Sequence, residues 1–557
     1  CDYGDYPHMN IEKLIKRWGK LAEDKSQWHS LWDDLARVML PRRIGFSTTT
    51  TPGDRRTADV FDSTPMQAAL KLANVVGWML RPDGLPEIKM RVDEQEINDT
   101  EEAKAWIAEA ENRMRAAFNN PKARFRQAAG EADQDLVVFG TAVMYAGETA
   151  QRNHLLFQTL HLKDATVFFN DEGAVEGLFR KKKMPIRDME TKFGLNKLSE
   201  ATRKLAEQDQ DKKIEVLHAV LPRETKRKNP LFAKDLPYAD YWIEIEAKHQ
   251  LSEGGFHEFP FIVPRWDTSS GEDYGRSPGM IALPDADTLQ AMGETILIAG
   301  QRAADPPLAV PNDGAFDAIN TFPGGLAYYD VETAALIRGN PFFPIESGMN
   351  LPITRDMQAD TRNQVWAAFF RNILNLPIDG PEMTATEVIQ RKEEFIREIG
   401  PIFGRLESDY TGPTVERGFM IMLRGGAFPP IPPILQGQNI RFEYESPIIK
   451  IRRQVEATAA RMWVEEQVKL SIETQKIEIL DTVNFDAHAR FTAEALNIPA
   501  QIVNSSEYVE QVRKNRIEAM AAMQEAEAMQ QSIMAAKTGA ETAEKVAKAT
   551  SLTGAQP

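Results

Sequence analysis

The chain has 557 residues, of which 42% are hydrophobic and 27% are charged, and its formal net charge is −16. This size allows roughly three or four hydrophobic cores, and no apolar run approaches the roughly 18 residues of a membrane-spanning helix. The acidic balance argues against an outer surface that wraps nucleic acid, because phosphate binding needs clustered Lys and Arg. The single cysteine, Cys1, excludes an internal disulfide framework and fits a reducing cytoplasm. The sequence starts without a methionine, which leaves the true N-terminus open.

The N-terminal part of the chain is predicted to be helical. Apolar residues at helical spacing predict helices over residues 10–40 (one helix or a pair), from about 64 to 80, and over 99–118 and 122–138. Pro41 ends the first helical stretch, and residues 42–65 form a polar loop flanked by two arginine pairs. Near the end of that loop, Asp62 or Ser63 is expected to cap the next helix.

Between Gly140 and Phe261 the apolar period changes to two, which is typical of strands. Strands are expected at residues 142–147, 155–160, 166–169, 175–181, 214–221 and 238–246. The two glycines of Ser252-Glu-Gly-Gly255 predict a hairpin turn.

A long helix, a small insert and a returning helix are predicted next. Pro284, with the acids Asp285 and Asp287, is typical of a first helical turn, so a helix is expected from there to Ala304. Residues 305–348 are rich in Pro, Gly and aromatic side chains, with a strand candidate at 325–329, and the returning helix is expected over 351–376.

Prolines and a glycine then force a tight turn at Pro377–Pro381, and a further long helix is expected. Thr384 and Glu387 form its predicted capping box, in which hydroxyl and carboxylate satisfy two N–H groups. Its apolar positions form one continuous stripe that faces a partner, at Ile389, Ile396, Ile399, Phe403, Leu406 and Tyr410.

The C-terminal part is predicted to be almost entirely helical. A strand is expected at 440–444, followed by helices at about 450–480 and 484–496. The tail, residues 505–550, is rich in Ala, Met, Gln and Glu and favours a helix, but its methionines keep no heptad.

The sequence lacks the common motifs of nucleotide binding, nucleophilic catalysis and metal binding. There is no G-x-x-x-x-G-K-[ST] phosphate loop and no G-x-S-x-G nucleophile elbow. The eight histidines are scattered without Cys or acidic partners at metal-ligand spacing. We therefore predict no catalytic residue, no metal site and no cofactor.

Several stretches of the sequence are distinctive as strings of residues. They are Phe61-Asp-Ser-Thr64, Tyr274-Gly-Arg-Ser-Pro278, Met383-Thr-Ala-Thr-Glu-Val388, Arg391-Lys-Glu-Glu394, Gly400-Pro401 and the run from Gly425 to Pro433. Together they resemble the head-to-tail connector (portal) proteins of short-tailed, podovirus-type bacteriophages. The resemblance extends over nearly the whole chain, from about Trp18 to Arg516, and no single catalytic motif carries it.

The resemblance implies a mainly α, α+β fold with a β-rich wing, a helical stem, a small α/β clip and a helical crown. The implied division is wing 1–277, with a helical N-terminal part and a β-rich part at 140–262, stem helix 278–304, clip 305–349, returning stem helix 350–376, tunnel loop 377–384, long wing helix and return strand 385–449, crown 450–513 and helical tail 514–557.

The function implied by the resemblance is structural rather than enzymatic. The subunit would form a homo-oligomeric ring, a dodecamer, at one capsid vertex, through which double-stranded DNA is packaged and ejected without sequence-specific binding. The implied partners are the terminase large subunit, tail or adaptor proteins, and capsid and scaffolding proteins, with no membrane. The implied location is the virion, after assembly in the host cytoplasm.

The resemblance also assigns candidate site residues. In the tunnel loop, Ile378, Asp379 and Glu382 are expected to project into the DNA channel. In the clip, the candidates for partner docking are Asn312, Asp313, Phe322, Tyr328 and Tyr329.

Two other classes of protein stay open as alternatives. One is a bacterial hydrolase or transferase with an α/β domain at 140–262, which the missing catalytic signatures disfavour. The other is a coiled-coil adaptor, which the predicted β-rich middle disfavours.

Overall fold

The structure is a computed structural model. It describes residues 10–552 apart from 52, 83, 86–87, 99, 150, 224–231, 313–324, 331–342, 345–350, 372–396, 398–399, 445–446, 497, 499–501 and 505. The chain divides into two compact units, Cys1–Ile449 and Lys450–Pro557, which are described separately. The described residues are mainly helical, with several small sheets.

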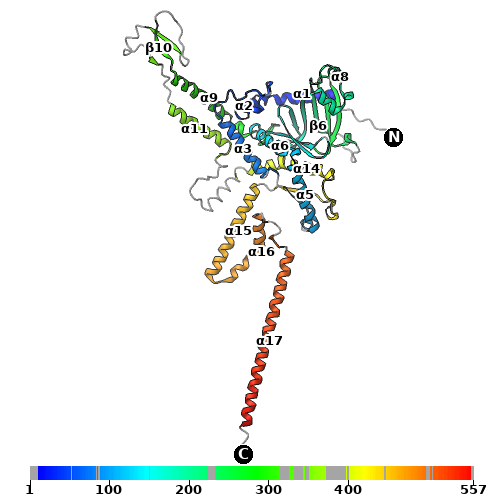
Figure 1. The fold of residues 1–557 in the computed structure, drawn as a ribbon, viewed down its shortest axis with the longest axis vertical. Helices are drawn as coiled ribbons and strands as arrows, with labels where there is room; N and C mark the ends of the chain where they lie inside the picture. Colours follow the sequence, from blue (N-terminus) through cyan, green and yellow to red (C-terminus); the bar gives the residue numbers. More distant parts are fainter. Residues whose placement is uncertain are drawn as a thin grey trace, which may run out of the picture. The chain divides into compact units, whose positions relative to one another are not determined.

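The first unit begins with helices and returns to helices after a β-rich middle (Figure 1). Its α-helices are α1 Ile11–Ser26, α2 His29–Met39, α3 Thr64–Leu80, α4 Gln95–Asn98, α5 Glu101–Asn119, α6 Phe125–Phe139, α7 Ile186–Phe193, α8 Glu200–Ala206, α9 Pro278–Ala304, α11 Leu351–Ala368 and α14 Gly412–Arg424. The predicted pair over 10–40 is confirmed as α1 and α2, and the helices predicted at 99–118 and 122–138 are confirmed as α5 and α6.

Four small sheets are present among the described residues of this unit. Their strands are β1 Ile88–Val92, β2 Val143–Glu148, β3 Leu155–Leu160, β4 Ala165–Phe169, β5 Val175–Pro185, β6 Lys213–Pro222, β7 Tyr238–Glu244, β8 His249–Phe256, β9 Phe261–Ile262, β10 Leu308–Asn312, β11 Leu326–Asp330, β12 Phe343–Pro344 and β13 Ile440–Tyr444. The sheet orders are β1-β13, β11-β10-β12, β3-β2-β9 and β4-β5-β6-β7-β8. All pairs are antiparallel except β10 with β11.

The strands expected between residues 140 and 262 are confirmed, but the hairpin turn predicted at Ser252–Gly255 is wrong. Those residues lie inside β8, and the turn lies before it, where Lys248 has a left-handed φ of 47°. Gly255 is needed for a close approach instead, because a Cβ there would lie 2.3 Å from the carbonyl oxygen of Ala233. Since every strand pair in 140–262 is antiparallel, this region is not the α/β domain that the enzyme alternative requires.

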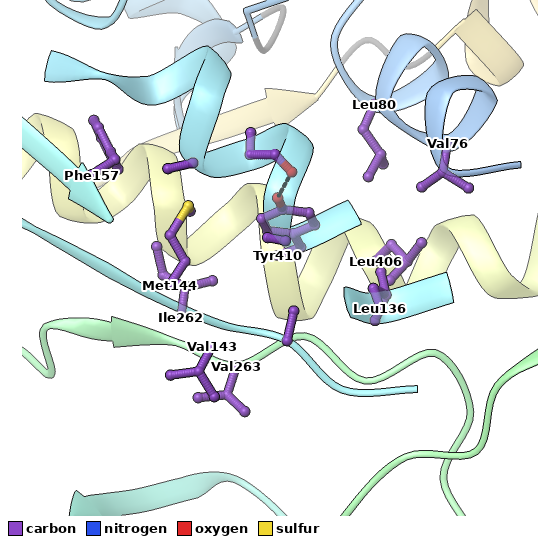
Figure 2. Packing of buried hydrophobic residues seen from close by; sticks show 14 of the residues in the cluster. Val76, Leu80, Leu136, Val143, Met144, Phe157, Ile262, Val263, Leu406 and Tyr410 are labelled. Atoms are coloured by element: carbon purple, nitrogen blue, oxygen red, sulfur yellow. Dashed lines mark hydrogen bonds between the residues drawn. The ribbon is translucent and has the colours of Figure 1, made fainter. Parts of the chain in front are cut away.

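The main core of the first unit lies where α3, α6 and α14 pack against β2 and β3. Figure 2 shows Val76 and Leu80 of α3 and Leu136 of α6 close to Leu406. The stripe predicted for the long helix is confirmed at its described positions, because Phe403, Leu406 and Tyr410 are all buried. Burial of this apolar surface is the main stabilising contribution to the unit.

The long helix widens into a π-helical segment at Glu407–Thr411, which the apolar stripe did not predict. There the N–H of Gly412 bonds to the carbonyl oxygen of Glu407, five residues back. The next residue is Pro413, which has no N–H to donate and whose ring needs space next to the preceding turn. The widened turn therefore lets one helix continue past a proline.

Tyr410, within the π segment, closes a buried polar cluster. Its hydroxyl donates to the carbonyl oxygen of Ala129 over 3.2 Å (Figure 2). Its ring centroid lies 5.0 Å from the guanidinium of Arg81. Arg81 in turn forms an ion pair with Asp133 of α6. Gly77 allows this pair to lie close to α3, since a Cβ at that position would be 2.8 Å from Asp133 Oδ2.

Helix α1 covers the outer face of the five-stranded sheet. Leu14 packs there with buried residues of β4 to β7, including Phe168, Leu217 and Tyr241. Lys25, at the end of α1, is buried and donates to three carbonyl oxygens, those of Leu162, Lys163 and Ala165, at 3.0, 2.8 and 3.1 Å. Burial lowers the pKa of Lys25 to about 8.

The second unit contains three α-helices among its described residues. They are α15 Pro447–Thr474, which spans the unit boundary, α16 Phe485–Ala495 and α17 Ser506–Leu552. They agree with the helices predicted for 450–480, 484–496 and the tail. In α17 the described side chains are mostly exposed, including Met520, Met523, Met529 and Met534.

Candidate functional site: the paired helices α9 and α11

Helices α9 and α11 lie side by side and run in opposite directions, and the small sheet containing β10 lies beyond their common end (Figure 1). Thr361 of α11 approaches the sulfur of Met292 of α9 over 3.8 Å, which fixes the level at which the two helices face each other. Each helix differs from the sequence prediction at one end, α9 at its start and α11 at its end. The chain therefore leaves the β-rich body along one helix, forms the sheet, and returns along the other.

The predicted start of α9 at Pro284 is wrong. The helix begins at Pro278, and Ser277 is its N-cap, with a side chain that accepts from the N–H of Met280 over 3.0 Å. Pro278 already occupies the first turn, where a proline is tolerated, so Pro284 lies inside the helix. Helix propensity alone does not decide which of the two prolines, Pro278 or Pro284, occupies the first turn.

The predicted end of the returning helix at Leu376 is also wrong for α11, which ends at Ala368. Phe370 then has a left-handed φ of 60°, a conformation that ends a helix. Phe369 is buried in the main core, so the packing of the aromatic side chains sets this end.

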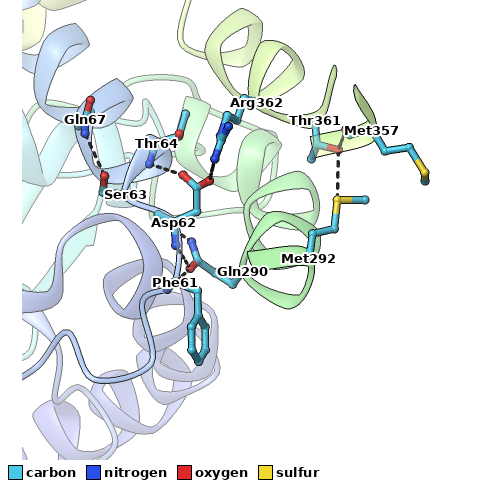
Figure 3. Close-up of polar contacts among 10 residues, drawn as sticks. All are labelled: Phe61, Asp62, Ser63, Thr64, Gln67, Gln290, Met292, Met357, Thr361 and Arg362. Atoms are coloured by element: carbon cyan, nitrogen blue, oxygen red, sulfur yellow. Dashed lines mark hydrogen bonds and ion pairs between the residues drawn. The ribbon is translucent and has the colours of Figure 1, made fainter. Parts of the chain in front are cut away.

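A cluster of polar groups holds the helix pair to the start of α3 (Figure 3). The side-chain oxygen of Gln290 on α9 accepts from the backbone N–H groups of Phe61 and Asp62 at 2.8 and 2.9 Å. Its amide nitrogen donates back to the carbonyl oxygen of Asp62 over 2.7 Å. Because Gln290 is buried, these three bonds satisfy the polar atoms of its own side chain and, at the same time, backbone groups of Phe61 and Asp62.

The carboxylate of Asp62 joins α3 to α11. Its Oδ1 accepts from the N–H of Thr64 over 2.8 Å, and its Oδ2 accepts from Nε and Nη2 of Arg362 at 2.9 and 2.8 Å. Burial raises the pKa of Asp62, but the hydrogen bonds from Thr64 and the ion pair with Arg362 outweigh it, so the pKa lies below its ordinary value. One carboxylate thus caps a helix and pairs with a cation on another helix.

Of the two residues predicted to cap α3, Asp62 performs the capping. Ser63 occupies the N-cap position but its side chain caps no backbone N–H; its hydroxyl instead accepts from the side chain of Gln67 over 2.9 Å. Gln290 and Arg362 were not predicted as partners of Asp62. A glutamine or an arginine on an amphipathic helix carries no pattern that distinguishes a buried contact from an exposed one.

The other predicted site residues divide into two groups. Asn312 ends β10 and pairs with Asp330, and Tyr328 and Tyr329 belong to β11, where they pair with Val310 and Pro311. The remaining candidates lie outside the described residues: Asp313, Phe322, Ile378, Asp379, Glu382, Thr384 and Glu387. Their assignments stay predictions.

The arrangement positions helices rather than reacting groups. Within the described part of the chain, no group of three or more His, Cys, Asp or Glu side chains is placed to hold a metal ion. Among the same residues, no helix is long and apolar enough to cross a membrane. At this site, polar side chains hold a long helix pair against an α+β body.

The chain belongs to the family of bacteriophage head-to-tail connecting proteins, whose profile matches residues 11–503. It is 27% identical over 543 residues to the "Probable portal protein" of Bordetella phage BPP-1, covering 96% of this chain and 94% of that protein. It is also 27% identical over 543 residues to the "Portal protein" of Salmonella phage epsilon15, covering 95% of each.

Solved structures match more distantly. A chain of the "Virion of native gene transfer agent (GTA) particle" is 10% identical with a TM-score of 0.35, covering 79% of this chain and 94% of that chain. A chain of the "Neck of native GTA particle computed with C12 symmetry" is 11% identical with a TM-score of 0.34, covering 72% of this chain and 85% of that chain.

Proposed function

We propose that this chain is the portal subunit of a bacteriophage, which forms a ring at one capsid vertex through which double-stranded DNA is packaged and ejected. The observation that carries the proposal is the match to two phage portal proteins, which covers nearly the full length of this chain and of each relative. The architectural character of the helix pair supports it, because the described site positions helices and brings no reacting groups together.

In this ring the helix pair α9 and α11 is the stem and runs along the channel axis. The sheet β11-β10-β12 belongs to the clip, which docks the terminase during packaging and tail or adaptor proteins afterwards. Asn312, Tyr328 and Tyr329 are candidate docking residues because they lie on that sheet. The β-rich body is the wing, and the helices of the second unit are the crown and tail.

Residues 377–384 are the tunnel loop of the proposed ring, with Ile378, Asp379 and Glu382 at the channel. This stretch has two acids and no basic residue, so its copies form a negative collar that guides DNA without binding its phosphates. Asp379→Lys adds one phosphate contact per subunit, which steepens the salt dependence of DNA binding by roughly 0.9 in log–log slope. Rings of this variant should assemble normally and slow DNA passage at low salt only. Passage that is unchanged at every ionic strength would remove the loop from the channel.

Electron microscopy of the purified chain in end view tests the proposal as a whole. A closed ring of about a dozen copies, with a central hole wide enough for duplex DNA and no hydrolysis of ATP, is the expected result. Light scattering that shows a monomer across micromolar concentrations would count decisively against a ring.

A further inference from the structure

A hollow of about 700 Å³ lies at the start of α3 and is here named the α3 hollow. Its apolar lining includes Leu40, which follows α2, and Met66 and Leu70 of α3. Leu70 is 49% exposed. Single exposed apolar residues are ordinary, but an apolar hollow of this size is typical of a binding site.

Two arginines, Arg42 and Arg56, line the polar side of the α3 hollow. Nη1 of Arg56 donates to the carbonyl oxygen of Arg42 over 2.7 Å, so the two residues lie side by side. Neither arginine forms an ion pair with any residue that the structure describes. Asp54, an acid that also lines the hollow, accepts from the N–H of Thr51 instead. The hollow therefore favours an occupant that combines apolar side chains with acidic groups.

Residues 1–9 of the chain have this combination and are here named the arm; they lie outside the described residues. The arm reads Cys-Asp-Tyr-Gly-Asp-Tyr-Pro-His-Met, so an Asp-Tyr pair occurs twice, at residues 2–3 and 5–6, and no Lys or Arg is present. Aromatic rings pack well against aliphatic and thioether side chains such as those of Leu40 and Met66, and a carboxylate pairs with a guanidinium. The two acids and two tyrosines of the arm thus match the two arginines and the apolar lining of the hollow.

The α3 hollow of the same copy is out of reach of the arm. Helix α1 begins at Ile11 and spans 16 residues, or about 24 Å, before α2 starts. In Figure 1, α1 and α2 follow one another, and α2 lies between α1 and α3. With Tyr6 in the hollow, only Pro7 to Asn10 would remain to cross this length, and these four residues span at most about 14 Å. The arm that binds in a given hollow therefore belongs to another copy of the chain.

We propose that residues 1–9 of one copy of this chain bind in the α3 hollow of a second copy. The acids of the arm pair with the arginines of the hollow, and its tyrosines pack against the apolar lining. The inference rests on the proposed ring, which places a second copy beside every copy. The contact is heterologous, since each copy offers its arm to one neighbour and its hollow to the other.

Binding of a synthetic peptide tests the contact without the ring. The probe is a fluorescently labelled peptide with the sequence of residues 1–10 and serine in place of the cysteine. The protein is the full chain with Asp2→Asn/Asp5→Asn, whose own arm has lost its charges and leaves the hollow open to the peptide. Fluorescence anisotropy should show saturable binding. Adding Arg42→Glu/Arg56→Glu to this chain places like charges across the contact and should weaken binding at least about tenfold.

Two controls show that the contact is specific. Adding Lys212→Glu/Lys213→Glu instead, at two exposed lysines at the start of β6, changes the net charge equally and should leave peptide binding unchanged. A peptide with lysine at both aspartate positions should prefer the glutamate hollow to the arginine hollow. Circular dichroism checks that each variant is folded. If the glutamate hollow is not folded, Leu70→Ser, at a half-exposed position, replaces it and should weaken binding several-fold.

Cys1, the single cysteine of the sequence, lies in the arm and allows a second test in the full-length chain. Thr57 lines the hollow and is exposed, so Thr57→Cys places a thiol there. Oxidation of the assembled protein should link each chain to the next and give a ladder of covalent oligomers on a denaturing gel. Asp171→Cys, at the exposed turn between β4 and β5, is the matched control and should give no ladder beyond that of the unchanged chain.

Three outcomes overturn the inference. The first is that the peptide does not bind, or binds the glutamate hollow as tightly as the arginine hollow. The second is that oxidation of the Thr57→Cys chain gives no more covalent oligomer than the control. The third is a disulfide that forms within one chain. If the unchanged chain forms no ring, the proposed portal function fails instead, and the peptide assay still reports on the hollow because it needs no ring.

Discussion

Arg362 of α11 donates two hydrogen bonds to the carboxylate of Asp62, which lies 300 residues earlier in the chain and begins α3. The carboxylate is buried, whereas the arginine side chain is 44% exposed. This ion pair, together with Gln290, fixes the helix pair to the body of the first unit.

Arg362→Met should destabilise the first unit by about 1–3 kcal/mol, because it leaves the buried carboxylate of Asp62 without its cation. Urea unfolding measures the change. Arg355→Met, on the exposed side of the same helix, is the control and should change stability by less than about 0.5 kcal/mol. Equal effects of the two substitutions would mean that the ion pair between Arg362 and Asp62 contributes nothing to the free energy of unfolding.

The same pair gives a pH dependence of known sign. The pKa of Asp62 is lower in the folded chain than in the unfolded chain. Its contribution to stability is therefore complete above the unfolded value of 3.8 and is lost as the pH falls through the folded value. Asp62→Asn should flatten the acid limb of the unfolding curve, and an unchanged limb would contradict the assignment.

Gly77→Ala should destabilise the first unit by about 1–3 kcal/mol, because the new methyl group would collide with Asp133, which its ion pair with Arg81 holds in place. Gly130→Ala is the matched control on α6, where a Cβ meets nothing within 4 Å. It should raise stability by about 0.5–1 kcal/mol through helix propensity. Thermal unfolding of both variants measures these two changes in stability. Stabilisation by Gly77→Ala would show that Asp133 can move.

Lys25 should make the first unit more stable as the pH rises from 8 toward 10.5. Burial lowers its pKa from 10.5 to about 8, so the unfolded chain binds the proton more tightly over that range. The gain amounts to roughly 3 kcal/mol at most. Lys25→Met should reduce this rise, leaving the share of Lys192, whose pKa burial also lowers to about 8, while Lys16→Met, at an exposed position of the same helix, should keep the rise in full. Parallel urea titrations from pH 7 to 10.5 measure the difference.

Removal of the tail from Lys537 onward should leave the proposed ring intact. The described side chains of α17 in this stretch are exposed, and the apolar residues of the tail form no continuous stripe. Size-exclusion chromatography with light scattering, on full-length and truncated chains, measures assembly. Loss of the ring on truncation would make the tail an assembly element.

The sequence predicted those elements whose periodicity is a local property. The strand at Leu155–Leu160 and the strand at Ile440–Tyr444 were placed to the residue, because alternating burial leaves a visible period of two. The prediction was wrong for glycines that are required by a close contact with a residue distant in the sequence. Gly254 and Gly255 looked like a turn, although Gly255 admits the backbone of Ala233 against a continuous strand.

The candidate site was the least predictable part of the chain. Asp62 was found as a capping residue, but Arg362 and Gln290 meet it only after α3, α9 and α11 pack together. The π segment was missed because Phe403, Leu406 and Tyr410 keep the spacing of an ordinary helix up to the point where it widens. Long-range packing, rather than local propensity, decides such features.

The pairing of β1 with β13 sets the order in which a nascent chain can complete its fold. Val92 pairs with Ile440 and Ile88 with Tyr444, and among the described residues β1 has no other strand beside it. During synthesis β1 therefore stays unpaired until β13, which ends at Tyr444, has left the ribosome. Any product that terminates before that point keeps an open strand edge, which is a template for pairing with another chain.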